Sequence, residues 1–251
     1  DKKDLDLLDQ LNTQKFLMKK KPHFVIIAAA KVGGIMANNN YKAEFIYQNL
    51  QIQSNLIHSS YLAGVKKLIF LGSSCIYPKF SKQPIKEEYL LDGKLETTND
   101  AYAIAKIAGV KMCESYNQQY GLSYISLMPT NLYGPNDSYN LKNSHFYPAL
   151  ISKIYQAKIK KKKTIKIWGN GKAKREILFV DDLADACEFF LKKKVKHKII
   201  NIGSGQEKTI LGYAKFIMKK MNVNLQVLYD KKKPNGTPRK ILNFNLAKKY
   251  G

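Results

Sequence analysis

Short continuous apolar runs alternate along the chain with longer segments whose apolar residues recur at helical spacing. An apolar run of four to seven residues is typical of a strand buried on both faces. The expected strands are residues 24–30, 67–72, 124–128 and 199–202, with 164–168, 177–180 and 225–229 as further strands. The expected helices are residues 10–21, 43–63, 102–120, 148–158, 183–193 and 209–221. This alternation predicts an α/β fold built on a parallel sheet.

Local signals set the limits of several of these elements. Pro22 ends the first helix, whose apolar side is expected to consist of Leu11, Phe16 and Leu17. The pair Asp181-Asp182 is expected to cap the helix that follows it. These signals set the end of the first helix and the start of the helix 183–193.

Polar side chains follow the apolar run 68–71 directly, in the order Gly72-Ser73-Ser74-Cys75. In an open parallel sheet, chemistry lies just past the carboxyl ends of the strands. Further on, Tyr102 and Lys106 stand one helical turn apart and therefore share a face. A nearby ammonium lowers the pKa of a tyrosine toward neutrality, so the phenol could exchange a proton at a carbonyl whose oxygen the serine hydroxyl holds.

Each of these features alone has an ordinary structural explanation. A tyrosine and a lysine four apart in a helix usually mean a packed ring and a solvated ammonium, and serines after a strand are usually loop residues. The conjunction of strand, Ser73-Ser74-Cys75 and the Tyr102–Lys106 helix is much rarer, and it favours an active site.

The strand 24–30 ends in Ala28-Ala29-Ala30, and Gly33-Gly34 follows. Small side chains at a strand end let a cofactor approach the backbone, and the glycines allow a tight loop. A dinucleotide-binding fold opens with a strand, a glycine-rich turn and a helix. No such unit precedes His23, so we expect that the first strand, phosphate loop and helix are missing, and that the chain is a fragment also cut at its C-terminus.

Composition narrows the classes of function. With 251 residues and 45% hydrophobic content, the chain can form one large domain or two joined lobes. No apolar run approaches the roughly 20 residues that cross a bilayer. The three cysteines suit a reducing cytoplasm, without a disulfide framework.

The formal net charge of +24 raises the possibility of nucleic-acid binding. The charge is spread along the chain and is almost all lysine, because Arg175 and Arg239 are the only arginines. Nucleic-acid readers typically use arginine forks and clustered basic faces. A basic nucleic-acid-binding module and an inactive fragment therefore remain only as alternatives, and the charge is expected to attract anionic nucleotide substrates.

Five longer strings carry a resemblance to a known family. They are residues 28–35, 72–78, 102–109, 128–135 and 236–240. In this order they resemble the extended short-chain dehydrogenase/reductase family, in its branch that acts on GDP-sugars. The resemblance implies a Rossmann-like, doubly wound parallel sheet that binds NADP(H), formed by residues 1–142 with 176–205 returning to it. It further implies a smaller α/β substrate-binding lobe formed by residues 143–175 and 206–251.

The activity implied by the resemblance is the conversion of GDP-4-keto-6-deoxy-D-mannose to GDP-L-fucose. Cys75 and His145 would exchange the protons at carbons 3 and 5 and invert both centres. NADPH would then reduce carbon 4 while Tyr102 protonates the oxygen. Lys106 would lower the tyrosine pKa and hold the cofactor ribose, and Ser73 would polarise the carbonyl.

The resemblance also implies binding residues. The expected cofactor contacts are Lys2, Leu71, Gly72, Ser73, Ser74, Lys106, Pro129, Thr130, Asn131, Leu132 and His145. Lys2 stands where an arginine contacts the extra phosphate of NADPH, and residues 129–132 form a loop that borders the nicotinamide. The expected GDP-sugar contacts are Lys153, Trp168, Arg175 and Asn235, the last in place of an aspartate. No metal is expected.

The nearest alternative within the family is a nucleotide-sugar 4-epimerase or 4,6-dehydratase. Those enzymes share the serine, tyrosine and lysine roles but need no cysteine–histidine pair, so Cys75 and His145 discriminate. The expected partner is the GDP-sugar, with a second copy of the chain in a homodimer. Neither nucleic acid nor a membrane is expected, and the expected location is the cytoplasm.

Overall fold

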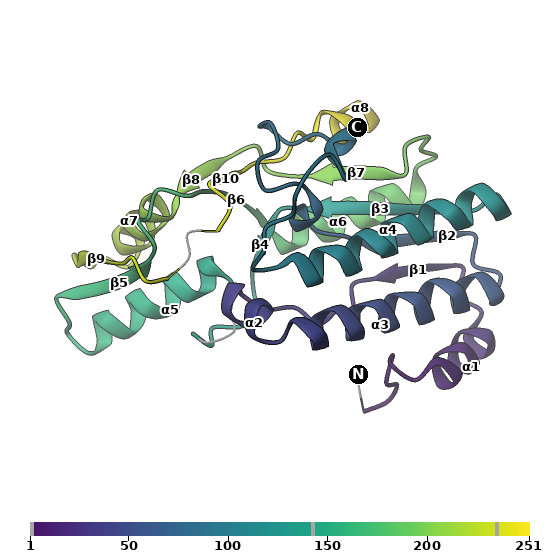
Figure 1. The fold of residues 1–251 in the computed structure, drawn as a ribbon, viewed down its shortest axis with the longest axis horizontal. Coiled ribbons are helices and arrows are strands. Elements are labelled where there is room, and N and C mark those ends of the chain that lie inside the picture. Colours follow the sequence, from purple (N-terminus) through teal and green to yellow (C-terminus); the bar gives the residue numbers. More distant parts are fainter. Residues whose placement is uncertain (1–2, 142–143, 234–235) are drawn as a thin grey trace.

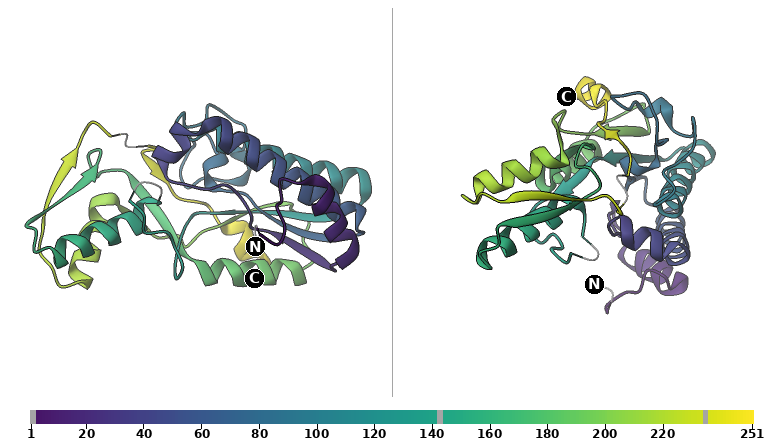
Figure 2. Two further views of the ribbon diagram at one scale, coloured as in Figure 1. Left: turned by 90° about the horizontal axis from the view of Figure 1, so that it is seen from below. Right: turned by 60° about the vertical axis from the view of Figure 1, so that its left-hand side comes forward.

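The computed structural model describes residues 3–141, 144–233 and 236–251. It has a larger body around a four-stranded sheet and a smaller lobe beside it (Figure 1). Figure 2 shows the same two parts from two further sides. The expected α/β fold class is confirmed.

The larger body is organised by a parallel sheet with the strand order β1-β2-β3-β7. Its strands are β1 (Phe24–Ile27), β2 (Lys67–Leu71), β3 (Ser123–Pro129) and β7 (Ile199–Ile202). Its helices are α1 (Gln10–Lys20), α2 (Ile35–Asn40), α3 (Lys42–Leu62), α4 (Asp100–Tyr120), α6 (Val180–Lys192) and α8 (Asn245–Tyr250), with short 3-10 turns η1 (Ser74–Ile76) and η2 (Glu87–Tyr89). The four apolar runs 24–30, 67–72, 124–128 and 199–202 are therefore the four strands of one sheet, as predicted.

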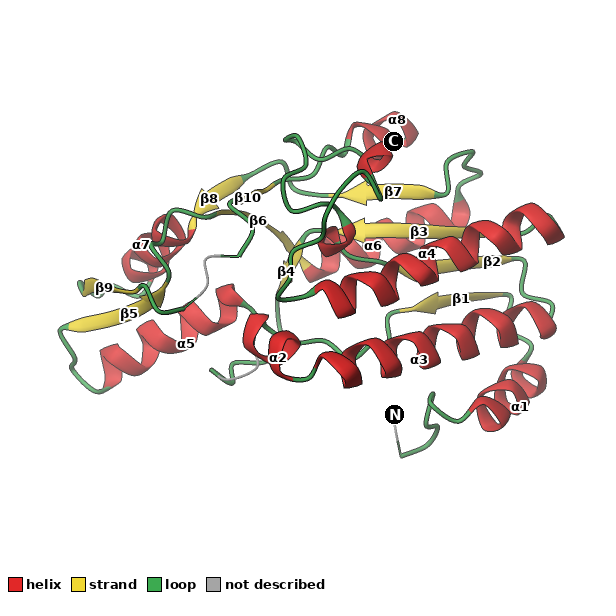
Figure 3. Ribbon diagram, viewed as in Figure 1, coloured by secondary structure: helices red, strands yellow, loops and turns green. Residues whose placement is uncertain are grey.

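Alternating side chains of the central strands serve both faces of this sheet. In β2, Leu68 and Phe70 belong to the core beneath α3 and α4, whereas Ile69 belongs to the core beneath α6. Figure 3 shows α3 and α4 together in front of the sheet and α6 behind it. This is the doubly wound arrangement, in which continuous apolar strands are buried on both sides.

The outermost strand β1 departs from the prediction of a strand buried on both faces. It pairs only with β2 among the described strands, and it ends at Ile27. Ile27 is buried, but Phe24 and Ile26 are 54% and 44% exposed. An apolar run therefore identified the strand correctly without revealing that one of its faces is uncovered.

Two local expectations were wrong in part. Of the three expected apolar residues of α1, only Leu17 is buried and belongs to the core, while Leu11 and Phe16 are exposed. Asp181-Asp182 lies in the first turn of α6 instead of capping it. There the carboxylates still favour the helix, through its N-terminal dipole.

The smaller lobe has its own core between two helices and a two-stranded sheet. It contains α5 (Phe146–Ile159), α7 (Ile210–Lys220), β5 (Thr164–Trp168) and β9 (Gln226–Asp230). Its core includes Leu150, Ile154, Ile167, Tyr213 and Ile217. The apolar side chains of α5 and α7 recur at helical spacing and those of β5 alternate, so that each element turns one apolar face toward this core.

A second small sheet joins the two parts. Its strands are β4 (Asn131–Tyr133), β6 (Lys174–Phe179), β8 (Glu207–Thr209) and β10 (Arg239–Lys240), with the order β10-β6-β4 and β8 paired to β6. Two predictions are corrected here. Residues 129–132, expected as a loop, form the end of β3 and the start of β4, and Arg175, expected before a strand, lies inside β6.

The chain returns to the larger body after β10. Leu242 is buried in the core beneath α3 and α4, and α8 packs its Leu246 and Tyr250 into the core beneath α6. Residues 242–250 thus lie on the larger body, although the expected division assigned 206–251 to the smaller lobe.

Close packing between α4 and β2 sets the spacing of the residues they carry. A Cβ built on Gly109 would lie 2.4 Å from Cζ of Phe70 and 2.9 Å from Cδ of Gln53. Gly72, directly after β2, is equally restricted, because a Cβ there would lie 2.4 Å from Sδ of Met128. Both glycines therefore allow backbones to approach where a side chain would push them apart.

We expect Gly109→Ala to destabilise the fold, although alanine favours a helix more than glycine by about 1 kcal/mol. The added methyl group must displace the fully buried ring of Phe70, and such overpacking costs about 1–3 kcal/mol. Urea unfolding of the variant should show this loss. In a Phe70→Leu background the same change should cost clearly less, because the ring is gone. Equal losses in both backgrounds would contradict the packing explanation.

Candidate active site

The carboxyl ends of three neighbouring strands meet at one edge of the large sheet. Ala28–Ala30 follow β1, Gly72–Cys75 follow β2, and Pro129 closes β3. Ser73 is extended and caps η1, where its hydroxyl accepts a hydrogen bond from the backbone N–H of Cys75 at 3.2 Å. This cap turns the chain sharply after the strand and holds the serine and the cysteine beside each other.

Lys106 ties α4 to this strand end. Its ammonium donates a 2.8 Å hydrogen bond to the carbonyl of Leu71, and it lies 4.7 Å from the ring centre of Phe70. The side chain is only 3% exposed, and burial lowers its pKa to about 8. The lysine is therefore a buried structural cation as well as a potential contact for a ligand.

The expectation that Lys106 lowers the pKa of Tyr102 is wrong for this structure. Burial raises the pKa of the Tyr102 phenol well above its usual value, the Cys75 thiol raises it further, and hydrogen bonding with Ser73 only partly opposes them. The ammonium points at the Leu71 carbonyl, 6.0 Å from the tyrosine ring centre. The phenol is consequently protonated at neutral pH, which is the form that donates a proton.

Cys75 meets a cation that sequence reasoning missed. Nζ of Lys240, in β10, lies 3.4 Å from Sγ of Cys75. Burial raises the pKa of the thiol, but the charge of Lys240, hydrogen bonds with Ser73 and Lys240, and the charge of Arg175 together bring it below its usual value. In the sequence, only its place in the string 236–240 distinguished Lys240 from the many other lysines. That place alone did not indicate a role beside Cys75.

His145 stands at the N-cap of α5. Partial removal from water lowers the pKa of its imidazole, Asp137 raises it, and the charge of Lys240 lowers it again. The charge of the Lys240 ammonium therefore acts on both predicted proton carriers, and Cys75 is the one it contacts.

Arg175 lies in β6 beside this group and is 8% exposed. Its Nη1 donates to the carbonyl of Lys174 at 2.8 Å. A Cβ on Gly236 would lie 3.2 Å from its Nη2, so the chain entering β10 runs close over the guanidinium. Burial lowers the pKa of Arg175, while Cys75 and Glu96 raise it.

Lys153 and Trp168 lie together in the smaller lobe. Nζ of Lys153 is 5.3 Å from the Trp168 ring centre and donates to the carbonyl of Lys166 at 3.2 Å. Lys233 approaches the same ring at 5.6 Å. The indole ring thus lies close to two lysine ammonium groups, which interact favourably with its face. The same charges would attract an anionic ligand to this part of the lobe.

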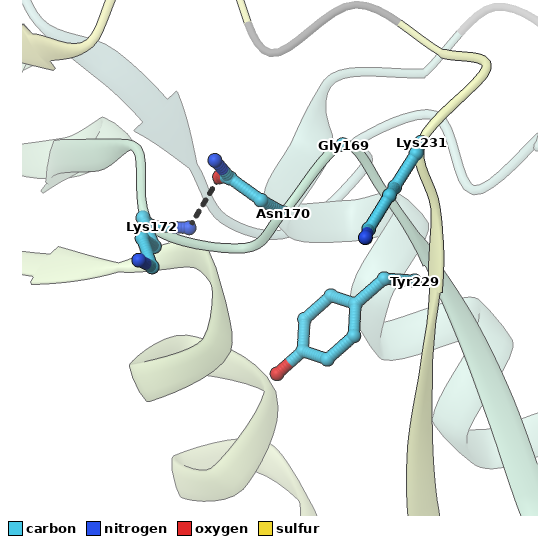
Figure 4. Close-up of a pocket in the computed structure, with 5 residues that line it drawn as sticks. All are labelled: Gly169, Asn170, Lys172, Tyr229 and Lys231. Atoms are coloured by element: carbon cyan, nitrogen blue, oxygen red, sulfur yellow. Dashed lines mark hydrogen bonds between the residues drawn. The ribbon is translucent and has the colours of Figure 1, made fainter.

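A separate pocket of about 580 Å³ opens in the same lobe (Figure 4). It is lined by Gly169, Asn170, Lys172, Tyr229 and Lys231, and Figure 4 shows the Asn170 side chain accepting a hydrogen bond from the backbone of Lys172. None of the predicted site residues lines it. The chemistry at Cys75 therefore identifies the candidate active site better than the size of this cavity does.

Glu176, the residue after Arg175, connects β6 to the larger body. It is fully buried, and its carboxylate accepts hydrogen bonds from the backbone N–H groups of Gly205 and Leu242, at 2.6 and 2.9 Å. Its backbone carbonyl accepts from the side chains of Thr130 and Asn131. Burial raises the pKa of this carboxyl, and these backbone hydrogen bonds partly oppose the rise. Sequence reasoning gave Glu176 no role.

The structure thus gathers Ser73, Cys75, Tyr102 and Arg175 with Lys240, whose charge also reaches His145. It places Lys106 beneath them and Lys153 with Trp168 in the smaller lobe. The predicted residues Lys2 and Asn235 lie outside the described residues.

The sheet edge fits a dinucleotide cofactor. Ala28–Ala30 and Gly72 carry small side chains or none, and Lys106 offers an ammonium beside the end of β2. Ser74 and Thr130, both buried, lie at neighbouring strand ends. The small side chains leave room at the backbone and Lys106 places a cation there, which suits a sugar–phosphate ligand.

Comparison with known proteins places this geometry in a family. The profile of the NAD dependent epimerase/dehydratase family matches residues 2–203. The chain is 52% identical to GDP-L-fucose synthase of Sinorhizobium fredii over 243 residues, which cover 97% of this chain and 77% of that protein.

Two solved structures share the fold closely. One is the GDP-L-fucose synthetase of Naegleria fowleri bound to NADP, with a TM-score of 0.89 and 30% identity over 100% of this chain and 78% of that one. The other is a GDP-mannoheptose C4 reductase of Campylobacter jejuni with NADP bound, with a TM-score of 0.88 and 33% identity over 100% of this chain and 83% of that one. Both similarities extend through the second small sheet and the smaller lobe.

The buried charge of Lys106 predicts a pH-dependent stability. Burial holds its folded pKa at about 8, below the 10.5 of a free lysine, so the folded state resists protonation. The resulting penalty is complete below pH 8 and fades as pH rises from 8 to 10.5. Relative to Lys106→Met, the wild type should therefore gain on the order of 2 kcal/mol of unfolding free energy between pH 7 and pH 10.

Urea unfolding at both pH values measures this gain. Lys111→Met is the matched control, because Lys111 lies on the same helix, half exposed and paired with Glu114. The difference between wild type and that control should stay constant. A constant difference for Lys106→Met as well would show that the Lys106 ammonium is not penalised by burial.

Proposed function

The chain belongs to the NAD dependent epimerase/dehydratase family, and from this premise we propose that it converts GDP-4-keto-6-deoxy-D-mannose to GDP-L-fucose. The enzyme inverts carbons 3 and 5 and then reduces the keto group at carbon 4 with NADPH. The observation that carries the proposal is the Cys75 thiol, held against Lys240 beside Ser73 and Tyr102. A proton carrier of this kind is additional to what a simple reductase needs.

The epimerisation uses the acidity of protons next to a carbonyl. Carbons 3 and 5 both adjoin the keto carbon, so removing a proton from either leaves charge on the keto oxygen. Ser73 holds that oxygen by a hydrogen bond. In this proposal Cys75 takes the proton and His145 returns one on the other face of the carbon, and the charge of Lys240 acts on both groups. The stereocentre is thereby inverted.

The reduction uses the same oxygen contact. NADPH, when bound at the sheet edge, supplies the hydride for carbon 4. Tyr102 donates its proton to the oxygen, and the raised pKa of its phenol keeps that proton available. Lys106 holds the Leu71 carbonyl and offers its ammonium to the cofactor ribose. When the cofactor is bound, residues 129–132 would border the nicotinamide and residues 71–74 would contact the cofactor.

Arg175, Lys153 and Trp168 bind the nucleotide part of the substrate in this proposal. Arg175 matches the two oxygens of a phosphate with its planar fork, while Lys153 places a charge beside the Trp168 ring. Asn235 completes the set by resemblance. The net charge of +24 favours the approach of a doubly phosphorylated sugar.

The alternatives receive less support. A 4-epimerase or a 4,6-dehydratase would use Ser73, Tyr102 and Lys106 but would not need the contact between Cys75 and Lys240. A nucleic-acid-binding module explains the charge but not the buried cluster at the strand ends. Similarity to GDP-L-fucose synthases over nearly the whole chain favours the same choice.

We further infer that the enzyme works as a cytoplasmic homodimer. The outer sides of α3 and α4 expose the apolar side chains Tyr47, Leu62, Ile104 and Tyr120, which a second copy could cover. Free cysteines at positions 75, 113 and 187 suit a reducing compartment. Among the described helices, none is both long and apolar enough to span a bilayer.

Cys75→Ser and Tyr102→Phe should separate the two chemical steps. We expect Cys75→Ser to lose deuterium incorporation from solvent at carbons 3 and 5, by roughly 10²–10⁴-fold, because a hydroxyl is a far weaker acid than this thiol. Tyr102→Phe should still exchange deuterium while NADPH oxidation falls by a similar factor. Mass spectrometry of the sugar and NADPH absorbance report the two steps.

The control for these variants is Cys187→Ala, which removes a buried thiol from α6, away from the strand ends. It should behave as wild type in both measurements. Deuterium exchange by Cys75→Ser at the wild-type rate would show that this thiol only packs, and the epimerase assignment would fail.

Arg175→Lys tests the phosphate contact. The charge survives but the bidentate geometry does not, so KM for the GDP-sugar should rise by about tenfold with little change in kcat. Arg239→Lys is the control, because Arg239 is exposed and paired with Glu207, and its KM should stay unchanged. Steady-state kinetics that give the same KM for Arg175→Lys and wild type would place Arg175 outside the substrate site.

A further inference from the structure

The contact between Lys240 and Cys75 joins two segments that are 165 residues apart in the chain. Nζ of Lys240 lies 3.4 Å from the thiol sulfur, within the range of a hydrogen bond to sulfur. Among the described residues, no carboxylate forms an ion pair with Lys240. The sulfur is therefore the group that this ammonium meets at close range.

The fold holds Lys240 in this position. In β10 it pairs with Arg175 of β6, and the next residues are fixed by backbone hydrogen bonds. Ile241 donates to the side chain of Gln83 at 3.0 Å, and Leu242 donates to the carboxylate of Glu176 at 2.9 Å. These contacts leave the lysine backbone little freedom to move away from the thiol.

The neighbouring residue shows that the placement is selective. Side chains alternate along a strand, so Arg239 and Lys240 point to opposite sides. Arg239 is exposed and forms an ion pair with Glu207 at 2.7 Å, whereas Lys240 is half-buried against Cys75. Of two adjacent cations, the strand turns one toward the surface and one toward the site.

The other groups around the thiol make a consistent environment. Ser73 hydrogen-bonds to Cys75, Arg175 adds a second positive charge from β6, and Tyr102 faces it from α4 as a protonated phenol. Burial works against an anionic sulfur here, and the two cations and the hydrogen bonds outweigh it, so the pKa of the thiol is lowered. The same lysine lowers the pKa of His145.

We propose that Lys240 is a positioning residue that stabilises the thiolate form of Cys75, so that Cys75 begins the epimerisation as the base. The inference rests on the proposed function of Cys75. When the thiolate takes a proton, the new S–H bond forms as the C–H bond at carbon 3 or 5 breaks, and the electron pair moves to the keto oxygen. Lys240 then faces a neutral thiol until that proton is passed on.

The decisive measurement is the titration of Cys75 itself, which needs neither substrate nor cofactor. The rate of alkylation by iodoacetamide, followed by mass spectrometry of the Cys75 peptide across pH, reports the thiolate fraction. In wild type the midpoint should lie below about 8.5, the value of a free thiol. A wild-type midpoint above that value would overturn the proposal without any variant.

Lys240→Gln removes the charge and keeps a hydrogen-bond donor. The alkylation midpoint should then rise by about 1 to 3 units, as expected for the loss of an opposite charge within 4–6 Å. Lys240→Arg should restore a midpoint near that of wild type. Arg239→Gln, on the same strand but on the opposite side, is the matched control and should leave it unchanged.

The exchange reaction supplies a second readout with a distinct pattern. Lys240→Gln should slow deuterium incorporation at carbons 3 and 5 by at least about tenfold at pH 7, and raising the pH should recover much of the loss, because the thiolate re-forms. A merely structural role would give a loss that pH does not repair. An unchanged midpoint in Lys240→Gln would overturn the proposal.

The two hypotheses fail in different ways. If the midpoint shifts as described but the wild type incorporates no deuterium, the coupling of Lys240 to Cys75 stands and the epimerase function is overturned. If wild type exchanges deuterium but the midpoint ignores Lys240→Gln, the function stands and the role of Lys240 is overturned.

Discussion

A single buried carboxylate holds the second small sheet in register with the larger body. Glu176 has no exposed surface, and an uncompensated charge at such a place would cost several kcal/mol. The chain supplies compensation from different directions, through the backbone of Gly205 after β7 and the backbone of Leu242 after β10. Gly203 is needed beside it, because a Cβ there would lie 2.6 Å from the carboxylate.

The active-site cations depend on this arrangement. Arg175 immediately precedes Glu176 in β6, and Lys240 lies two residues before the Leu242 amide that binds it. The carboxylate thus determines where β10 runs and, with it, how close the Lys240 ammonium comes to Cys75. Glu176 therefore influences the position of the active-site cations through backbone hydrogen bonds, without contacting the reacting groups itself.

Burial then separates the protonation behaviour of neighbouring groups. It raises the pKa of the Tyr102 phenol and lowers that of the Lys106 ammonium, so each is shifted toward its neutral form. Cys75 is shifted the other way, because two cations face it. One small volume therefore contains a phenol that keeps its proton and a thiol that loses its proton readily, which is what a proton transfer followed by a reduction requires.

Much of this could be predicted from the sequence, and the remainder could not for identifiable reasons. Apolar runs gave the four sheet strands, and the residues after β2 gave Ser73 and Cys75, because both signals are local. The direction of the Tyr102 shift was wrong, since helical spacing shows that Lys106 shares a face with the tyrosine but not that its ammonium turns to the Leu71 carbonyl. Lys240 was missed because its partner is far away in the chain and only the fold brings them together.

The two-residue strand β10 also limits how this region can change length. The register of its two residues, Arg239 and Lys240, with Lys174 and Arg175 decides which of the two cations faces the active site. Deleting one residue between this strand and Leu242 would place the Arg239 guanidinium where the Lys240 ammonium now lies, and inserting one there would turn Lys240 to the surface. A change in length after the strand would therefore separate the Lys240 ammonium from the Cys75 thiol.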